Sequence, residues 1–181
     1  MTTVVRVAER RDIPDLIRIH VDAWRVAYRG VIDDGYLDSS LLEDQRTTMW
    51  NAWGWSERPG QQVLVGEVDG RVVGFGFVGP ERAEPEGTFT GHGEVYAFYF
   101  HPDAWGSGAA TPMMHRCHDH LRSEGFSHAV LWVLRDNPRA RRFYEKMGWS
   151  TNGKESSFTG PQTAAALPYA VAEVQYGITL G

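Results

Sequence analysis

Residues 98–149, FYFHPDAWGSGAATPMMHRCHDHLRSEGFSHAVLWVLRDNPRARRFYEKMGW, decide the fold of this chain. An apolar run ends at Pro102, and small residues at 106–110 lead into a predicted helix. Glycine lets the backbone approach a ligand closely, and the first amides of a helix have no partner within it. These donors, at the positive end of the helix dipole, favour a phosphate or pyrophosphate. A second apolar strand, 129–134, then leads to Asn137 and a short helix that carries Tyr144.

Composition narrows the class of protein. The 181 residues are 42% hydrophobic and 23% charged, which is ordinary for a globular protein, and the length predicts a single domain over residues 1–181. A formal net charge of −5 argues against a nucleic-acid partner. The apolar runs are far shorter than the ~20 residues of a membrane span, and the start lacks an apolar signal-peptide core. One cysteine, Cys117, excludes an internal disulfide framework. We expect a cytoplasmic protein without a membrane partner.

Positive charge gathers around Asn137 despite the acidic total. The basic residues of this stretch are Arg135, Arg139, Arg141, Arg142 and Lys146. Such a patch on an acidic protein suits a small polyanionic ligand, although a solvated helix face explains each residue equally well.

The first half of the chain predicts a strand, two helical stretches and a hairpin. Residues 4–8 alternate between apolar and polar side chains, and Asp12 is expected to cap a helix that has Pro14 in its first turn. Residues 34–50 form a weaker helical pattern. The strands 63–68 and 71–78 flank Asp69-Gly70, a strong signal for a tight turn.

The second half predicts two further strands around an irregular segment. A polar, glycine-rich loop leads into the strand 94–100. Residues 152–170 are rich in Ser, Gly, Pro and Ala and are expected to be irregular, and 171–180 closes the chain as a strand. We expect one α/β (α+β) domain with a mostly antiparallel sheet.

Strand, anion loop, helix, strand, polar turn and helix, in this order, resemble the GNAT superfamily of acyl-CoA-dependent N-acetyltransferases. The family loop Gln/Arg-x-x-Gly-x-Gly/Ala becomes residues 105–110, in which Gly108 and Ala110 match and Trp105 replaces the leading Arg or Gln. The resemblance implies a central mixed sheet flanked by helices. Its fourth and fifth strands splay apart in a V, and the fourth strand is bulged.

The resemblance also implies the cofactor site, with acetyl-CoA as co-substrate and no metal. The opened strand would bind the pantetheine arm through the backbone of Phe98, Tyr99 and Phe100. The phosphates would lie on the loop residues Gly106, Ser107, Gly108, Ala109, Ala110 and Thr111. Asn137 matches the asparagine that closes the far side of the pantetheine channel; the alternative interpretation is a helix cap before Pro138.

Two residues match the family's acid and base. Tyr144 matches the tyrosine that protonates the departing thiolate, unless it is only an amphipathic core residue. Glu94 matches a carboxylate that accepts the proton of the amine, unless it is only an exposed strand end. Because Glu94, Tyr96 and Phe98 alternate along a strand, we expect them to share one face.

The family likeness predicts transfer of an acetyl group to the primary amine of a small molecule, by direct attack in a ternary complex. Ribosomal-protein alanine acetyltransferases carry a glutamate base five residues before the family asparagine, and here Trp132 stands at that position. A protein or peptide acetyltransferase is therefore a weaker alternative. A non-catalytic acyl-CoA-binding module is the other, favoured by Trp105.

The acceptor side is expected to lie at the first helices. In many relatives this region walls the acceptor pocket, and here it offers Trp24, Tyr28, Tyr36 and the aromatic stretch 50–55. Aromatic walls stack on planar groups or bind cations, although each residue also fits a core. The segment 156–168 is interpreted as a lid or as a contact in a homodimer.

A cluster on the predicted helix after residue 110 raises the question of a metal. Its members are His115, Cys117, His118 and His120. His115 and His118 share a face, but Cys117 points elsewhere and no carboxylate completes a shell. We interpret the cluster as a solvated helix face.

Overall fold

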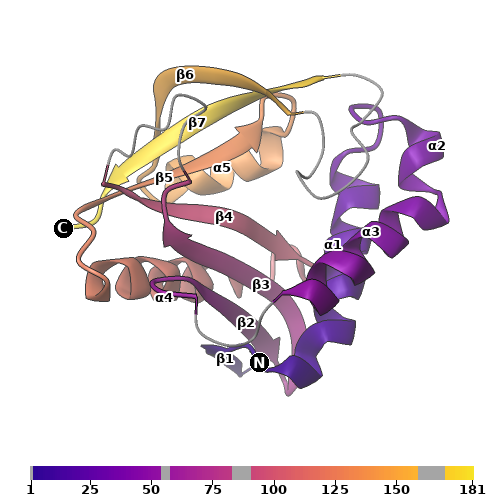
Figure 1. Cartoon of the computed structure of the whole chain (residues 1–181), viewed down its shortest axis with the longest axis horizontal. Coiled ribbons are helices and arrows are strands. Elements are labelled where there is room, and N and C mark those ends of the chain that lie inside the picture. The colour runs from indigo at the N-terminus through magenta and orange to yellow at the C-terminus, as the bar shows by residue number, and fades with distance from the viewer. Residues whose placement is uncertain (1, 54–57, 83–90, 159–169) are drawn as a thin grey trace.

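The computed structural model describes residues 2–53, 58–82, 91–158 and 170–181. Its strands form one sheet in the order β1-β2-β3-β4-β5-β7-β6 (Figure 1). The strands are β1 (Thr3–Val7), β2 (Gln62–Val68), β3 (Arg71–Pro80), β4 (Gly93–Phe100), β5 (His128–Leu134), β6 (Ser150–Phe158) and β7 (Val171–Thr179). The α-helices are α1 (Ile13–Ala27), α2 (Asp34–Leu37), α3 (Ser40–Ala52), α4 (Ala110–Ser123) and α5 (Pro138–Lys146), and the 3₁₀ turns are η1 (Arg10–Asp12) and η2 (Pro102–Ala104).

The sheet is mixed and mostly antiparallel, as expected. Among the described strands only β4 and β5 pair in parallel, and the other neighbours are antiparallel. The β2–β3 hairpin turns at Asp69 and Gly70, which have φ of 49° and 77°. Positive φ at both positions is what a tight primed turn requires, so the Asp-Gly prediction is confirmed.

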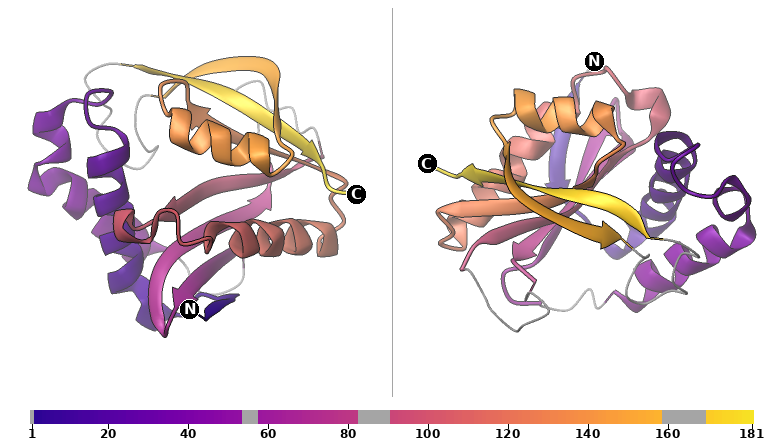
Figure 2. Two further views of the ribbon diagram at one scale, coloured as in Figure 1. Left: turned by 180° about the vertical axis from the view of Figure 1, so that it is seen from behind. Right: turned by 90° about the horizontal axis from the view of Figure 1, so that it is seen from above.

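Helices cover both faces of the sheet. In the left panel of Figure 2, α4 and α5 lie in front of the strands and α1–α3 lie at the left. Residues of α1 pack on the other face of the sheet. Side chains that alternate along β2 supply both interfaces: Val63 and Val65 pack in a cluster with α1, and Leu64 packs in a cluster with α4. Strand alternation therefore makes two cores from one short apolar run.

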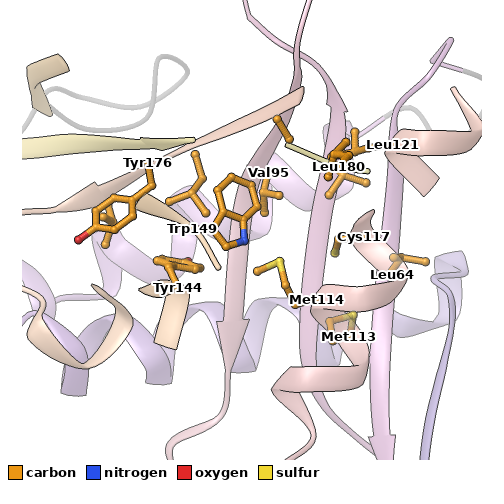
Figure 3. Packing of buried hydrophobic residues seen from close by; sticks show 14 of the residues in the cluster. Leu64, Val95, Met113, Met114, Cys117, Leu121, Tyr144, Trp149, Tyr176 and Leu180 are labelled. Atoms are coloured by element: carbon orange, nitrogen blue, oxygen red, sulfur yellow. The ribbon is translucent and has the colours of Figure 1, made fainter. Parts of the chain in front are cut away.

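The larger core lies between the sheet and α4 and α5 (Figure 3). Met113, Cys117 and Trp149 are buried in it. A glycine makes room for one of its aromatic rings, because a Cβ at Gly74 would lie 2.4 Å from the ring of Phe100. This close approach explains a glycine in the middle of β3.

The two parallel strands diverge after a short contact. Gly93, Glu94 and Val95 pair with β5, and no pairing is recorded beyond Val95 along the described part of β4. At the same point β4 has a bulge against β3, because Phe77 pairs with Ala97 and Val78 pairs with Val95. A bulge bends its strand and ends regular pairing. The splayed V expected between the fourth and fifth strands is thereby present.

The bulge corrects one expectation about side-chain direction. Val95 and Phe98 both belong to the α4-side core although they are three residues apart, so the bulge at Tyr96 reverses the alternation. Glu94, which neighbours Val95, therefore faces the other side of the sheet from Phe98. The prediction that both lie on one face is wrong, because an extra residue in a strand shifts its period by one.

Two predictions in the N-terminal region are also corrected. Residues 34–50 do not form one helix: α2 is capped by the Asp33 side chain and ends before a turn in which the Ser39 hydroxyl donates to the Tyr36 carbonyl. Asp12 stands at the N-cap position of α1, but its carboxylate accepts hydrogen bonds from Arg6 and from the Glu9 amide instead of from α1.

The segment predicted to be irregular begins with a strand. Residues 150–158 form β6, which pairs with β7 and is exposed along most of its length. An edge strand with polar side chains on both faces has no apolar alternation, so periodicity could not reveal it. Residues 156–158 of the expected lid belong to this strand, and 159–168 lie outside the described residues. No described helix is long and apolar enough to cross a membrane.

Candidate active site

A cleft of about 620 Å³ opens where β4 and β5 diverge. Its walls come from α1, the splayed halves of β4 and β5, the loop before α4, and α5. Of the nine predicted cofactor residues between Phe98 and Thr111, six line this cleft: Phe98, Tyr99, Phe100, Gly106, Gly108 and Ala110. Asn137, Tyr144 and Glu94 line it as well. The structure therefore brings most of the predicted site together around one opening.

The loop at 105–110 has the geometry of an anion site. Gly106 and Gly108 have φ of 81° and 86°, a region that favours glycine. Within the described residues their amides donate to no backbone carbonyl, and α4 begins directly after them. Free amides beside a helix N-terminus attract phosphate oxygens. The Ser107 hydroxyl instead accepts the Ala109 amide at 3.3 Å.

Trp105 is a structural part of this loop. Its indole nitrogen donates to the Phe100 carbonyl at 2.9 Å, which ties the loop to the end of β4. The guanidinium of Arg139, at the start of α5, lies 4.2 Å from the centre of the Trp105 ring. Arg139 also lines the cleft. The sequence noted a basic patch here but did not single out Arg139, whose position depends on how α5 docks against the loop.

The rest of the basic patch is engaged elsewhere or turned away. Arg135 pairs with Glu155 at 2.6 Å, and Arg141 donates to the Tyr176 hydroxyl at 3.0 Å. Arg142 and Lys146 are exposed. Of these five cations, Arg139 is the one that lines the cleft.

Asn137 caps a helix and also lines the cleft. Its side-chain oxygen accepts the Ala140 amide at 3.1 Å and so caps α5, while the residue lines the cleft opposite β4. The carboxamide nitrogen makes no recorded bond within the described residues. A cap made through the side-chain oxygen leaves the NH₂ group available as a donor.

Tyr144 sits at the buried end of the opening. It is only 7% exposed, and its ring meets Phe98 edge to face at 6.4 Å. Burial raises the pKa of its hydroxyl well above the ordinary value, with smaller contributions from Tyr99 and Cys117. Within the described chain the hydroxyl has no recorded hydrogen bond. Tyr144 is therefore a protonated phenol that faces the cleft.

Two carboxylates, Glu94 and Glu173, line the opening. Glu94 is 2% exposed, and both of its oxygens accept hydrogen bonds from Arg82, which donates through its amide at 2.9 Å and through its guanidinium. Glu173 from β7 also lines the cleft. Burial raises the pKa of Glu173, Arg82 opposes this shift and Glu94 adds to it. Glu173 was not predicted from the sequence, because this residue follows a segment that was expected to be irregular.

Comparison with known proteins identifies the arrangement. Residues 3–149 match the model of the acetyltransferase (GNAT) family. The chain belongs to this family. It is 33% identical over 135 residues to the uncharacterized N-acetyltransferase YuaI of Bacillus subtilis, a match that covers 74% of this chain and 73% of YuaI. The family and these relatives make it an acyltransferase of the acetyl-CoA-dependent kind.

Solved structures show the same fold. The PaiA N-acetyltransferase of Thermoplasma acidophilum in complex with coenzyme A aligns with a TM-score of 0.73 at 15% identity, over 99% of both chains. YncA of Salmonella typhimurium with its cofactor acetyl-CoA aligns with a TM-score of 0.69 at 20% identity, over 100% of this chain and 95% of YncA. Both neighbours hold the coenzyme on a GNAT fold.

The cleft of this GNAT chain has an aromatic wall at α1, where the acceptor was expected. Trp24, Tyr28 and Tyr99 line the cleft there, and the hydroxyls of Tyr28 and Tyr99 lie 3.3 Å apart. Tyr36 does not line the cleft, and Trp50 is buried against Phe75 in the α1-side core. Of the aromatic stretch 50–55, residues 54 and 55 lie outside the described residues.

A buried arginine lies behind this wall. Arg46 on α3 is 1% exposed, and its guanidinium carbon lies 4.1 Å from the centre of the Trp24 ring. None of its three nitrogens has a hydrogen-bond partner within the described chain. A cation–π contact contributes about 0.5–2 kcal/mol. Burying an unpaired ion costs several kcal/mol. The ring therefore does not offset the cost of burying the charge.

The cluster of three histidines and Cys117 was predicted to be a solvated helix face, and this prediction is wrong for two of its residues. His118 is 5% exposed, packs against Trp149 with ring centroids 5.5 Å apart, and has its pKa lowered to about 4, mainly by burial. Cys117 is buried, which raises its pKa to about 12. His115 is exposed, and His120 contacts the Gly60 carbonyl at 3.0 Å. Two of the four residues are thus core residues, because α4 packs one face on the sheet.

Proposed function

We propose that this chain moves the acetyl group of acetyl-CoA to the primary amine of a small molecule, by direct attack in a ternary complex. The observation that carries the proposal is the opening of β4 from β5 directly beside Tyr144, whose hydroxyl faces the cleft without a recorded partner among the described residues. An opened strand edge, an anion loop and a buried acid at one cleft are the parts that thioester aminolysis needs.

The coenzyme would bind along three surfaces. The free amides at Gly106 and Gly108 would hold the pyrophosphate, together with the N-terminal amides of α4. The unpaired edge of β4, from Phe98 to Phe100, would bind the pantetheine amides as an added strand. Asn137 would donate to the arm from the other side of the V.

Tyr144 would supply the proton for the departing thiolate. The neutral amine nitrogen attacks the thioester carbon, the carbon–sulfur bond breaks, and the sulfur takes the phenolic proton. The nitrogen then loses a proton to form the amide, and this proton restores the phenol of Tyr144. A raised tyrosine pKa makes the phenol a weak donor in water. Burial destabilises a thiolate for the same reason, so a sulfur in this cleft is more basic as well. The two groups therefore remain matched when they share one desolvated site.

The two carboxylates divide the base function unequally. Glu94, the predicted base, lines the cleft, but both of its carboxylate oxygens already accept hydrogen bonds from Arg82. Glu173 has a raised pKa, which brings a carboxylate closer to the range in which general bases work. We therefore assign removal of the ammonium proton first to Glu173, with Glu94 and Arg82 setting the charge around it.

The acceptor is proposed to be small because bulky side chains line its end of the cleft. Trp24, Tyr28 and Tyr99 stand there as a wall, and the space lies inside the opened V. Such a wall accommodates an amine with an apolar or planar body. A peptide acceptor would need an open groove at this place.

Calorimetry tests the coenzyme part of the proposal. Acetyl-CoA should bind, and a pantetheine fragment without phosphates should bind far more weakly, because the loop amides recognise the pyrophosphate. Gly108→Val should weaken binding of acetyl-CoA, since φ of 86° is strained for valine. Equal affinities for acetyl-CoA and the fragment would show that the loop is misinterpreted.

A further inference from the structure

The acceptor end of the cleft is backed by a group of buried donors that lack acceptors. Besides the three nitrogens of Arg46, the indole nitrogens of Trp24 and Trp50 and Nδ1 of His20 have no hydrogen-bond partner within the described residues. These residues form one cluster: His20 lies 5.9 Å from Trp24 and 6.3 Å from Trp50 between ring centroids. Buried donors normally find partners, so several unpaired donors in one place indicate a missing acceptor.

The charge of the cluster specifies that acceptor. Arg46 brings a positive charge and a planar fork of donors, which suits a carboxylate or a phosphonate. His20 adds no charge, because burial, with help from Arg46, lowers its pKa well below the ordinary value. The Tyr36 hydroxyl, which donates to Gln45 at 2.6 Å, lies close enough to oppose the lowering of the Arg46 pKa by burial, but it is neutral and leaves the charge without a counterion. Within the described residues, the cluster is therefore a cationic donor site without a recorded anion.

The cluster adjoins the path that an acceptor would follow. Tyr144, at the acetyl end, lies close enough to Tyr99 for Tyr99 to raise the pKa of Tyr144. The hydroxyls of Tyr99 and Tyr28 lie 3.3 Å apart, the Tyr28 and Trp24 rings lie 5.0 Å apart between centroids, and Arg46 lies against Trp24. Trp24, which lines the cleft, thus contacts the guanidinium, which does not itself line it.

Resting on the proposed function, we propose that the acceptor carries an acid group, a carboxylate or phosphonate, in addition to its amine, and that Arg46 binds this group. The amine would lie toward Tyr144, and the acid would reach Arg46 beside the Trp24 ring. The unpaired charge then has a function: it costs stability in the free protein and is neutralised by the substrate.

Matched acceptors test this inference. Amino acids are compared with their carboxamides, and aminoalkylphosphonates with their dimethyl esters, by kcat/KM for thiol release. The ratio of acid to neutral partner is compared between the wild type and Arg46→Gln, so that differences in amine basicity cancel. Losing a charge-assisted contact should lower this ratio about 10–100-fold. Arg46→Lys should lower it less, because lysine keeps the charge but not the fork.

Two controls separate this role from a structural one. Arg29→Gln removes an arginine that follows Tyr28 in sequence but does not line the cleft and pairs with Asp38 at 2.7 Å on the surface, and it should leave the ratio unchanged. Arg46→Met should melt no lower than the wild type in the absence of ligand, because it removes an unpaired buried charge. A clear fall in melting temperature would show that Arg46 is a structural residue and would overturn the inference.

The remaining outcomes are also decisive. Acetylation of neutral amines without preference for acids, or a preference that survives in folded Arg46→Gln, would overturn the inference and leave the acetyltransferase reaction intact. If no amine is acetylated, calorimetry of the same acids and neutral partners on the CoA complex decides, and equal or absent binding overturns it. Failure of acetyl-CoA itself to bind would instead refute the proposed function.

Discussion

The Arg139 guanidinium carbon lies 4.2 Å from the centre of the Trp105 ring, at the mouth of the anion loop. Trp105 stands where GNAT loops resembling this one begin with Arg or Gln, so the loop itself brings no cation. The contact supplies a cation from α5 instead, because a ring face holds a guanidinium in place without using its hydrogen-bond donors. Trp105, which stands in place of the expected loop cation, thus contacts an arginine that is distant in sequence.

This pairing predicts the effect of removing Arg139. Arg139→Ala should weaken acetyl-CoA binding about tenfold, the size of one exposed charge-assisted contact, and should reduce the salt dependence of binding. Arg142→Ala is the matched control. Arg142 is an exposed cation on the same helix, but it does not line the cleft. Calorimetry at two salt concentrations distinguishes them, and equal losses for both variants would refute a specific role for Arg139.

The acid role of Tyr144 predicts a loss of turnover without a loss of affinity. Tyr144→Phe should lower kcat by roughly 10² or more, the usual contribution of a positioned acid. Acetyl-CoA affinity should stay within about twofold, because the ring and its contact with Phe98 are retained. Thiol-release kinetics and calorimetry measure the two quantities. An unchanged kcat would remove Tyr144 from the mechanism.

Glu173 and Glu94 should respond differently to substitution. In the wild type kcat/KM should rise with pH through the raised pKa of Glu173, because only the carboxylate accepts a proton. Glu173→Gln should lower kcat/KM and remove this step, measured with one amine so that its own titration cancels. Glu94→Gln should retain a step, moved to a different pH. A profile that Glu173→Gln leaves unaltered would contradict the assignment.

The same shift makes a prediction about stability. Folding raises the pKa of Glu173 above 4.5, so its protonated form favours the folded state. This contribution is complete below pH 4.5 and is lost as pH rises through the folded-state pKa. Glu173→Gln should therefore raise the melting temperature at pH 7 more than at pH 4. A melting curve that shifts equally at both values would refute the linkage.

The glycines of the sheet allow a test of packing. Gly74→Ala should lower the free energy of unfolding by about 1–3 kcal/mol, because its Cβ would lie 2.4 Å from the Phe100 ring. Gly177→Ala is the matched control in β7, where the nearest atom, the Ala129 carbonyl oxygen, is 3.9 Å away. Urea unfolding compares the two. Equal stabilities for the two variants would show that the contact at Phe100 relaxes without cost.

The sequence predicted those parts of the protein whose signal is local. The Asp69-Gly70 turn follows from the backbone freedom that the turn needs, and the anion loop follows from its glycines and the helix after them. The order of elements, through its resemblance to a known family, supplied the mixed sheet and the V. These features depend on residues adjacent in sequence or on a motif of fixed spacing.

What the sequence did not reveal depends on tertiary contacts. The resemblance implied a bulge in the fourth strand but not its position at Tyr96, which reverses the side-chain direction between Glu94 and Phe98. The strand β6 is polar on both faces and is defined only by its pairing with β7. Glu173 and Arg46 acquire their environments from distant elements, so their chemistry appears only in the folded chain.

The most direct test of the central claim is whether the protein makes an N-acetylated amine from acetyl-CoA. The wild type should be incubated with acetyl-CoA and the amine panel, and thiol release and acetamide product should be quantified together, with Tyr144→Phe as the control. We predict one acetamide for each thiol released, at a rate that falls at least 10²-fold in Tyr144→Phe. Binding of acetyl-CoA without any acetamide product, or equal product from wild type and variant, would contradict it.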